Sequence, residues 1–165
     1  MKDTGDVTDT LDLESAREAL AAQPFSVLLG TRLVAFGAGA ATLELDIREE
    51  LLQQHGFLHG GVLGYAADNA LTFAAGAVLG PRVVTAGFTI DYLRPATGTL
   101  LHAEAHVVRA GRTRAVCRCD VSAIAADGTP RLCAVAQGTV SVAGHAQSWT
   151  GRPLQPSKDA RWTHS

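Results

Sequence analysis

The chain has 165 residues, 47% of them hydrophobic, and a formal net charge of −2 at pH 7. This length and apolar content are typical of one domain with a hydrophobic core. The sequence has no block of basic residues, so we do not expect it to bind nucleic acid. Its polar first residues lack the apolar run of a secretory signal, and we therefore expect a cytoplasmic protein.

The first part of the chain predicts one short helix and then two paired strands. Residues 1–12 are polar, and we expect them to be disordered. Residues 13–22 favour a helix that ends before Pro24. Two strands joined by a Gly-Ala-Gly turn are predicted at residues 31–36 and 40–47, and apolar residues alternate with polar ones in the second.

One long helix is predicted next, over residues 60–79, and the Gly-Pro dipeptide that follows ends it. The helix is almost wholly apolar and has about the length of a membrane span. However, Asp68, Asn69 and Thr72 lie near its centre. We therefore predict a buried helix and no membrane association.

Four strand-like segments follow the helix and are separated by turn residues. The order of elements predicts an α+β fold, because a helix that is apolar on every side needs a curved antiparallel sheet wrapped around it. We expect one domain over residues 13–143, followed by a flexible tail at 144–165. The four segments are residues 83–92, 99–109, 113–125 and 131–143.

Three cysteines are present, and two of them alternate with a charged residue on a predicted strand. Cys117 and Cys119 therefore share one face of that strand. They could form a metal pair, but no further Cys or His pair completes a zinc site. We favour small buried residues in a reducing compartment and expect no metal.

The most informative segment is the start of the long helix. A His59-Gly60-Gly61 turn opens it, and Asp68 is the carboxylate inside it. A helix start offers free backbone N–H groups and the positive end of a dipole, which suit a developing oxyanion. A carboxylate combined with such donors suggests acyl transfer or hydrolysis. The alternative is a structural carboxylate, but the neighbouring sequence offers no cation to neutralise it.

Several motifs together resemble one protein family over residues 25–142. The chain is similar to hotdog-fold thioesterases of the PaaI-like, phenylacetic-acid-degradation subgroup. The matched features are Gly56 before the His-Gly-Gly turn, Asp68-Asn69 nine residues after His59, the strand Phe88-Thr-Ile-Asp-Tyr-Leu-Arg-Pro95, and the turn Gly111-Arg112-Thr113.

The resemblance implies an acyl-CoA thioesterase that uses no cofactor and works as a homodimer or a tetramer of dimers, with sites between protomers. It implies that the backbone N–H of Gly60 binds the thioester carbonyl, and that Asp68 acts as nucleophile or as general base. Gln53 would place the thioester or the water, although many relatives have Asn there and Gln54 could compete. Thr85 would assist the water. His59 is a candidate general base, but its place at the helix start favours a structural role equally, and the resemblance implies that it mainly shapes the turn and the site.

Further residues are candidates for substrate binding. Gly61 permits close approach of a ligand to the backbone, and Asn69 follows the carboxylate. Arg94 and Arg112 could bind the phosphates of coenzyme A, because a guanidinium matches phosphate geometry. A solvated strand end is the alternative for either arginine.

The spacing of Gly60 and Asp68 supports a shared site. Eight residues of helix separate them by roughly 12 Å, so one helix cannot bring both groups to one carbon atom. Two antiparallel helices of a symmetric pair can. Two rival functions remain: a hotdog module that binds acyl-CoA without hydrolysing it, and a dehydratase or hydratase, which needs a differently placed acid and base.

Overall fold

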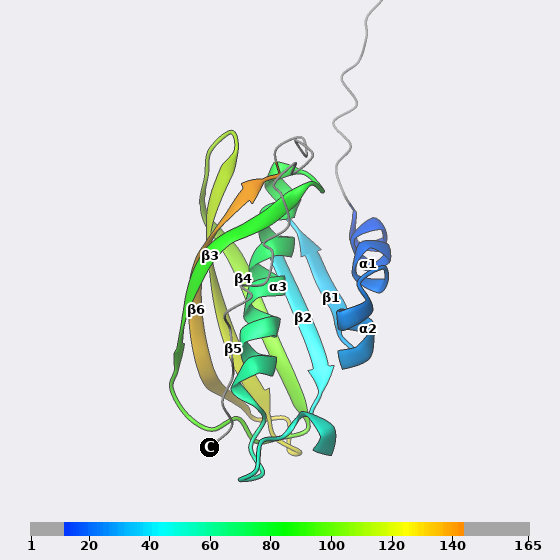
Figure 1. Cartoon of the computed structure of the whole chain (residues 1–165), viewed down its shortest axis with the longest axis vertical. Helices are drawn as coiled ribbons and strands as arrows, with labels where there is room; N and C mark the ends of the chain where they lie inside the picture. The colour runs from blue at the N-terminus through cyan, green and yellow to red at the C-terminus, as the bar shows by residue number, and fades with distance from the viewer. Residues whose placement is uncertain (1–11, 144–165) are drawn as a thin grey trace, which may run out of the picture.

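One antiparallel sheet of six strands curves around a single long helix (Figure 1). The structure is a computed structural model that describes residues 12–143, so the predicted disordered N-terminus, except for Asp12, and the predicted tail lie outside the described residues. The strand order is β1-β2-β4-β5-β6-β3. The predicted α+β hotdog architecture is confirmed. The strands are β1 (Arg32–Gly37), β2 (Ala40–Asp46), β3 (Val83–Tyr92), β4 (Leu100–Ala110), β5 (Arg114–Ile124) and β6 (Pro130–Val142).

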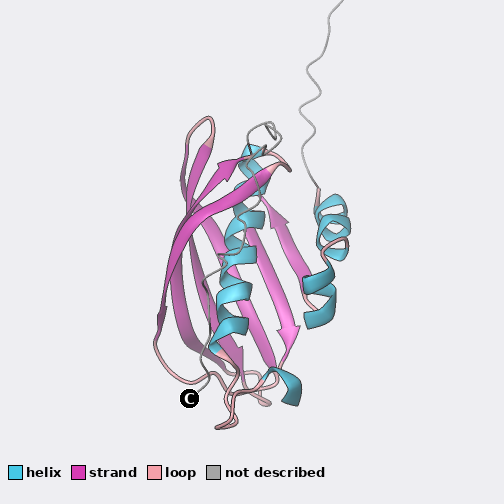
Figure 2. Cartoon of the chain, viewed as in Figure 1, coloured by secondary structure: helices cyan, strands magenta, loops and turns pink. Residues whose placement is uncertain are grey.

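The long helix α3 spans Gly60–Leu79, as predicted, and contacts all six strands from the concave side of the sheet (Figure 2). His59 is its N-cap, and it ends at Gly80, where the backbone turns to a φ of 91°. The helix is apolar and long enough to cross a bilayer, but over half of its most apolar window is buried inside the domain. That burial is typical of a core helix.

The two faces of α3 differ, which corrects the expectation of a helix enclosed on every side. The face toward the sheet is built mainly of small side chains, and they recur with helical periodicity: Ala66, Ala67, Ala70, Ala74 and Ala75 are all buried. Asp68, Asn69 and Thr72 lie on the other face and are only half-buried. The residues that carry chemistry therefore project away from the sheet.

Two short helices precede the sheet. The predicted first helix is confirmed as α1 (Leu13–Ala21), with Asp12 as its N-cap accepting from the N–H of Ser15. A second helix, α2 (Pro24–Leu29), was not predicted. Pro24 occupies the first helical position, where its missing N–H and fixed φ suit a helix start. In Figure 1 both helices lie beside β1, and α1 contacts that strand.

A β-bulge in β3 changes which side chains face the helix. Thr85 pairs with Val140 and Gly87 with Thr139, so Ala86 is the extra residue. The half-buried positions accordingly shift from Val83 and Thr85 to Phe88 and Ile90. Without the bulge, Thr85 and Phe88 would lie on opposite faces of the strand.

The three cysteines are free and buried in the core. Cys117 and Cys119 lie on the same face of β5, as predicted. Burial raises the pKa of Cys117 to about 11 and that of Cys119 to about 12. Within residues 12–143 no group of three or more His, Cys, Asp or Glu side chains could hold a metal ion.

The folded protein should therefore resist thiol alkylation. At about pH 8 both thiols stay protonated because their pKa values lie well above that pH, and only the thiolate reacts. Mass spectrometry after iodoacetamide treatment should find Cys117 and Cys119 unmodified in the native protein and alkylated in denaturant. Rapid labelling of either thiol in the native protein would contradict this burial.

Close contact between β6 and β3 makes Gly138 a sensitive position. A Cβ added there would lie 2.6 Å from Phe88 Cβ and 2.9 Å from the carbonyl oxygen of Gly87. Gly138→Ala should lower the free energy of unfolding by about 1–3 kcal/mol, because the strands must separate to admit the methyl group. Denaturant unfolding measures this loss. Gly87→Ala is the matched control, since nothing lies within 4 Å of its added Cβ, and an equal loss there would contradict the contact.

Candidate active site

The Asp68 carboxylate is held by a threonine of the neighbouring strand. Thr85 Oγ1 donates to Asp68 Oδ1 over 2.7 Å. Thr72, one helical turn after Asp68, lies 2.8 Å from Thr85 Oγ1 and also donates to the Asp68 carbonyl oxygen. Because Thr85 gives its only hydroxyl proton to the carboxylate, the single hydroxyl proton of Thr72 is shared between the Thr85 oxygen and the Asp68 carbonyl oxygen. The chain of hydroxyls orients the carboxylate and leaves Asp68 Oδ2 without a hydrogen-bond partner among the described residues.

The start of α3 presents a backbone donor, the N–H of Gly60, to which no described residue offers an acceptor. His59 Nδ1 accepts from the N–H of Gly61 over 2.9 Å, so His59 caps the helix. Within residues 12–143 no acceptor meets the N–H of Gly60. This N–H lies at the positive end of a 20-residue helix, where a negative charge is stabilised. The N–H of Gly60 is therefore available to an anionic group, and its role as oxyanion donor stays a prediction.

Tyr92 covers the first turn of α3, a contact not predicted from the sequence. Its hydroxyl donates to the carbonyl oxygen of Gly60 over 3.0 Å. An added Cβ at Gly60 or Gly64 would lie 3.5–3.6 Å from the Tyr92 ring or hydroxyl. Only small residues on the helix let the ring lie this close. The Gly-x-x-x-Gly spacing was the available signal, because residues four apart share one helix face.

A groove of about 430 Å³ opens at this helix start. Gln53, Gly60, Tyr92 and Arg94 all line it. Gln53 Oε1 accepts from the N–H of His55 in the preceding turn, and Gln54 is exposed and does not line the groove. The structure thus places Gln53, and not Gln54, beside Gly60.

Asn69 faces the short helices. Its Nδ2 lies within hydrogen-bond distance of Gln23 Oε1, Ser26 Oγ and Tyr65 OH, at 3.1–3.3 Å. Tyr65 in turn donates to Ser26 or Thr31. This network holds α2 against α3. The amide nitrogen of Asn69 is thus engaged in tertiary contacts. A role for Asn69 in substrate binding stays a prediction.

The two candidate arginines lie at opposite ends of the sheet. Arg94 is next to the start of α3, where the N–H of Leu58 donates to the carbonyl of Ala96. Arg112 is in the β4–β5 turn, at the far end of β4 and roughly 33 Å away along that strand (Figure 1). Both side chains are exposed. Arg94 and Arg112 of one chain therefore cannot bind the same phosphate group.

Comparison with known proteins gives a consistent result. The family model described as "Thioesterase superfamily" matches residues 55–125. A thioesterase family protein from Silicibacter pomeroyi has a TM-score of 0.72 and 33% identity, over 76% of this chain and 93% of that one. The 1,4-dihydroxy-2-naphthoyl-CoA hydrolase of Listeria monocytogenes is 26% identical over 69% of this chain and 91% of its own. The acyl-coenzyme A thioesterase PaaI of Escherichia coli is 33% identical over 53% and 63%, respectively.

The curved sheet, the long helix and its glycine-opened start define a hotdog-fold hydrolase of thioesters. The chain belongs to the thioesterase superfamily. The predicted resemblance to PaaI-like proteins is confirmed at the level of this family.

Removing the hydroxyl of Thr85 should impair thioester hydrolysis without unfolding the protein. Thr85→Val keeps the shape but leaves Asp68 Oδ1 without its donor. A hydrogen bond to a charged group contributes about 1.5–3 kcal/mol, so kcat/KM should fall roughly 10- to 100-fold. Thr85→Ser keeps the hydroxyl and should retain most of the activity. Equal rates for Thr85→Val and the parent protein would remove Thr85 from the site.

Proposed function

We propose that the protein hydrolyses acyl-CoA thioesters to a carboxylic acid and coenzyme A. The observation that carries the proposal is the free N–H of Gly60, which opens a 20-residue helix in a groove, together with the Asp68 carboxylate oriented by Thr85. Two relatives, a 1,4-dihydroxy-2-naphthoyl-CoA hydrolase and an acyl-coenzyme A thioesterase, support the substrate class.

The reaction begins when the thioester carbonyl accepts a hydrogen bond from the N–H of Gly60. Asp68 then either removes a proton from water, which attacks the carbonyl carbon, or attacks that carbon itself. The N–H and the helix dipole stabilise the negative oxygen of the tetrahedral intermediate. Its collapse breaks the C–S bond. In the water route, the thiolate of coenzyme A takes up the proton held by Asp68. In the direct route, loss of the thiolate leaves the acyl group on Asp68 as a mixed anhydride, which water then hydrolyses to the carboxylic acid and free Asp68, while the thiolate takes up the released proton.

The reacting groups come from two protomers in this proposal. Gly60 and Asp68 of one chain are separated by roughly 12 Å of helix, too far to act on one carbonyl. β3 is an edge strand with no second partner strand among the described residues, and Val84, Tyr92 and Leu93 on or beside it are 49–55% exposed. An isologous pairing across this edge would set two α3 helices antiparallel. A homodimer, alone or within a tetramer, would thus place Gly60 of one chain near Asp68 of the other.

Other residues bind the coenzyme A part of the substrate. Arg94 lines the groove at Gly60 and is suited to a coenzyme A phosphate. Arg112, at the opposite end of the sheet, could reach the same ligand only from the partner chain. Gln53 positions the thioester in the groove. We also propose a cytoplasmic location, which the three free, buried cysteines support.

Two single variants should each strongly reduce turnover. Asp68→Asn removes the acid, and Gly60→Pro removes the free N–H. Proline suits the first helical position, and His59 already has the extended ψ of 133° that a residue before proline requires. Release of free thiol should fall by about 10²–10³-fold in each case. Full activity in both variants would overturn the proposed mechanism, and an acyl-CoA that binds the parent protein but survives intact would favour a binding module.

Mixing the two variants tests the shared site. If subunits exchange, heterodimers contain one site with an intact Gly60 and an intact Asp68, and an equal mixture should regain about a quarter of the parent activity. A site built within one chain predicts no recovery. Size-exclusion chromatography of a tagged and an untagged subunit confirms that the exchange occurred.

A further inference from the structure

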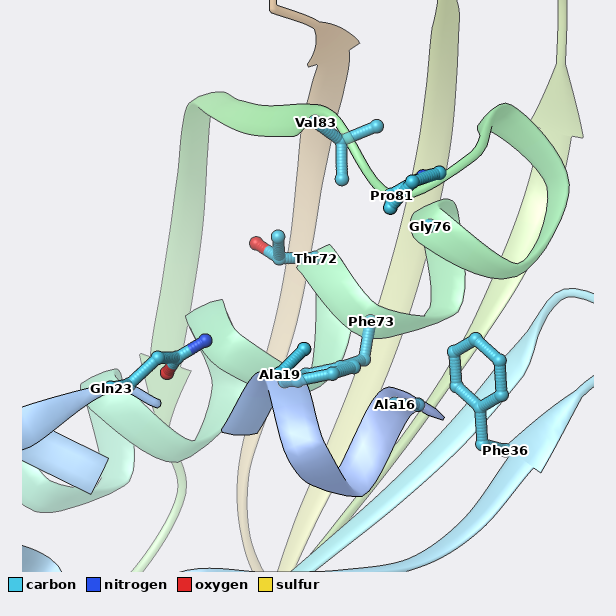
Figure 3. Close-up of a pocket in the computed structure, with 9 residues that line it drawn as sticks. All are labelled: Ala16, Ala19, Gln23, Phe36, Thr72, Phe73, Gly76, Pro81 and Val83. Carbon is cyan, nitrogen blue, oxygen red and sulfur yellow. The ribbon is translucent and has the colours of Figure 1, made fainter. Parts of the chain in front are cut away.

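A second pocket, separate from the groove at Gly60, lies beside Asp68 and has no role in the proposed steps of hydrolysis. It has a volume of about 140 Å³ and lies between α1, α3 and the start of β3 (Figure 3). Its walls are mostly apolar, and Figure 3 shows Ala16 and Ala19 on one side and Val83 and Pro81 on the other. We propose that this pocket holds the acyl group of the thioester and limits it to about the size of one six-membered ring. The inference rests on the proposed function.

Residues of two elements, α3 and β3, connect the pocket to the Asp68 carboxylate. Thr72 lines it and lies one helical turn after Asp68. Val83 lines it and precedes Thr85 by two residues on the same face of β3. Thr72 and Thr85 are hydrogen-bonded to each other, and Thr85 to Asp68. An acyl group whose carbonyl carbon is at Asp68 can therefore extend past Thr72 into the pocket.

Volume and lining define the acyl class. Apolar cavities of about 150 Å³ bind a molecule of the size of benzene, whereas a long alkyl chain needs far more room. Phe36 and Phe73 both line the pocket and pack edge to face, with ring centroids 6.3 Å apart. In this proposal their rings restrict the length of the acyl group that the pocket accepts. A ring, aromatic or saturated, or a short branched chain fits this space.

Two positions allow the pocket to be narrowed without disturbing the core. Ala19 lines it from the exposed side of α1, so Ala19→Leu directs a larger side chain into the space. Gly76 lines it from α3, and an added Cβ there would lie 3.8 Å from Val83 Cγ2, an ordinary contact. Gly76→Ala therefore takes up volume and also favours the helix. Ala21→Leu is the matched control, because Ala21 is exposed on the same helix and does not line the pocket.

The experiment compares kcat/KM for acetyl-, cyclohexanecarbonyl-, benzoyl- and lauroyl-CoA in the parent protein and the three variants. The parent protein should prefer both ring thioesters to lauroyl-CoA. Ala19→Leu and Gly76→Ala should lower the ratio of ring to acetyl activity by about tenfold or more, and Ala21→Leu should leave it unchanged. A parent preference for lauroyl-CoA, or equal losses for acetyl and ring thioesters in the pocket variants, would overturn the pocket assignment.

A binding measurement separates failure of this inference from failure of the proposed function. Benzyl-CoA and dodecyl-CoA thioethers cannot be hydrolysed, and calorimetry gives their affinities directly. Tighter binding of benzyl-CoA that Ala19→Leu weakens and Ala21→Leu does not would support the pocket even if no thioester were cleaved. Hydrolysis with no such discrimination would support the function and reject the pocket.

Discussion

The structure depends on close packing between the alanine-rich face of α3 and the concave face of the sheet. Small side chains are buried on both surfaces: Ala103, Ala105 and Ala134 of the sheet and Ala67 and Ala70 of the helix are all 0% exposed. Such packing brings the helix near the strands and removes apolar surface from water on both sides, which is the main favourable term in folding. It also determines the direction of the helix axis, and with it the positions of the Gly60 N–H and the Asp68 carboxylate.

This packing leaves the polar face of α3 available for chemistry. The sheet covers one side of the helix, and α1, α2 and β3 reach the other side only in part. Asp68 is held there by Thr85, and Asn69 is held by the α2 network. The site therefore combines a rigid support with an accessible carboxylate, and orientation by a rigid support is what catalysis by proximity requires.

Much of the fold follows from local patterns. The helix at residues 60–79 and the strand at 83–92 were predicted with their observed bounds, because Gly and Pro mark the ends and apolar residues are continuous between them. The helix α2 was missed, because Pro24 was interpreted as a helix end and six residues are too few to show a period. The half-burial of Asp68 was also missed, although its spacing with Thr72 already indicated a shared polar face.

The sequence by itself determined the long helix, the six strands, the donor at the start of α3 and the carboxylate eight residues later, since these depend on neighbours along the chain. Tertiary structure decided the partners of those groups. Thr85 reaches Asp68 because a bulge at Ala86 alters the alternation of β3, and Tyr92 covers Gly60 from the far end of the same strand. The acyl pocket likewise combines side chains from α1, β1, α3 and β3. Contacts between distant segments depend on how the sheet curves and pairs, and local periodicity carries no information about either.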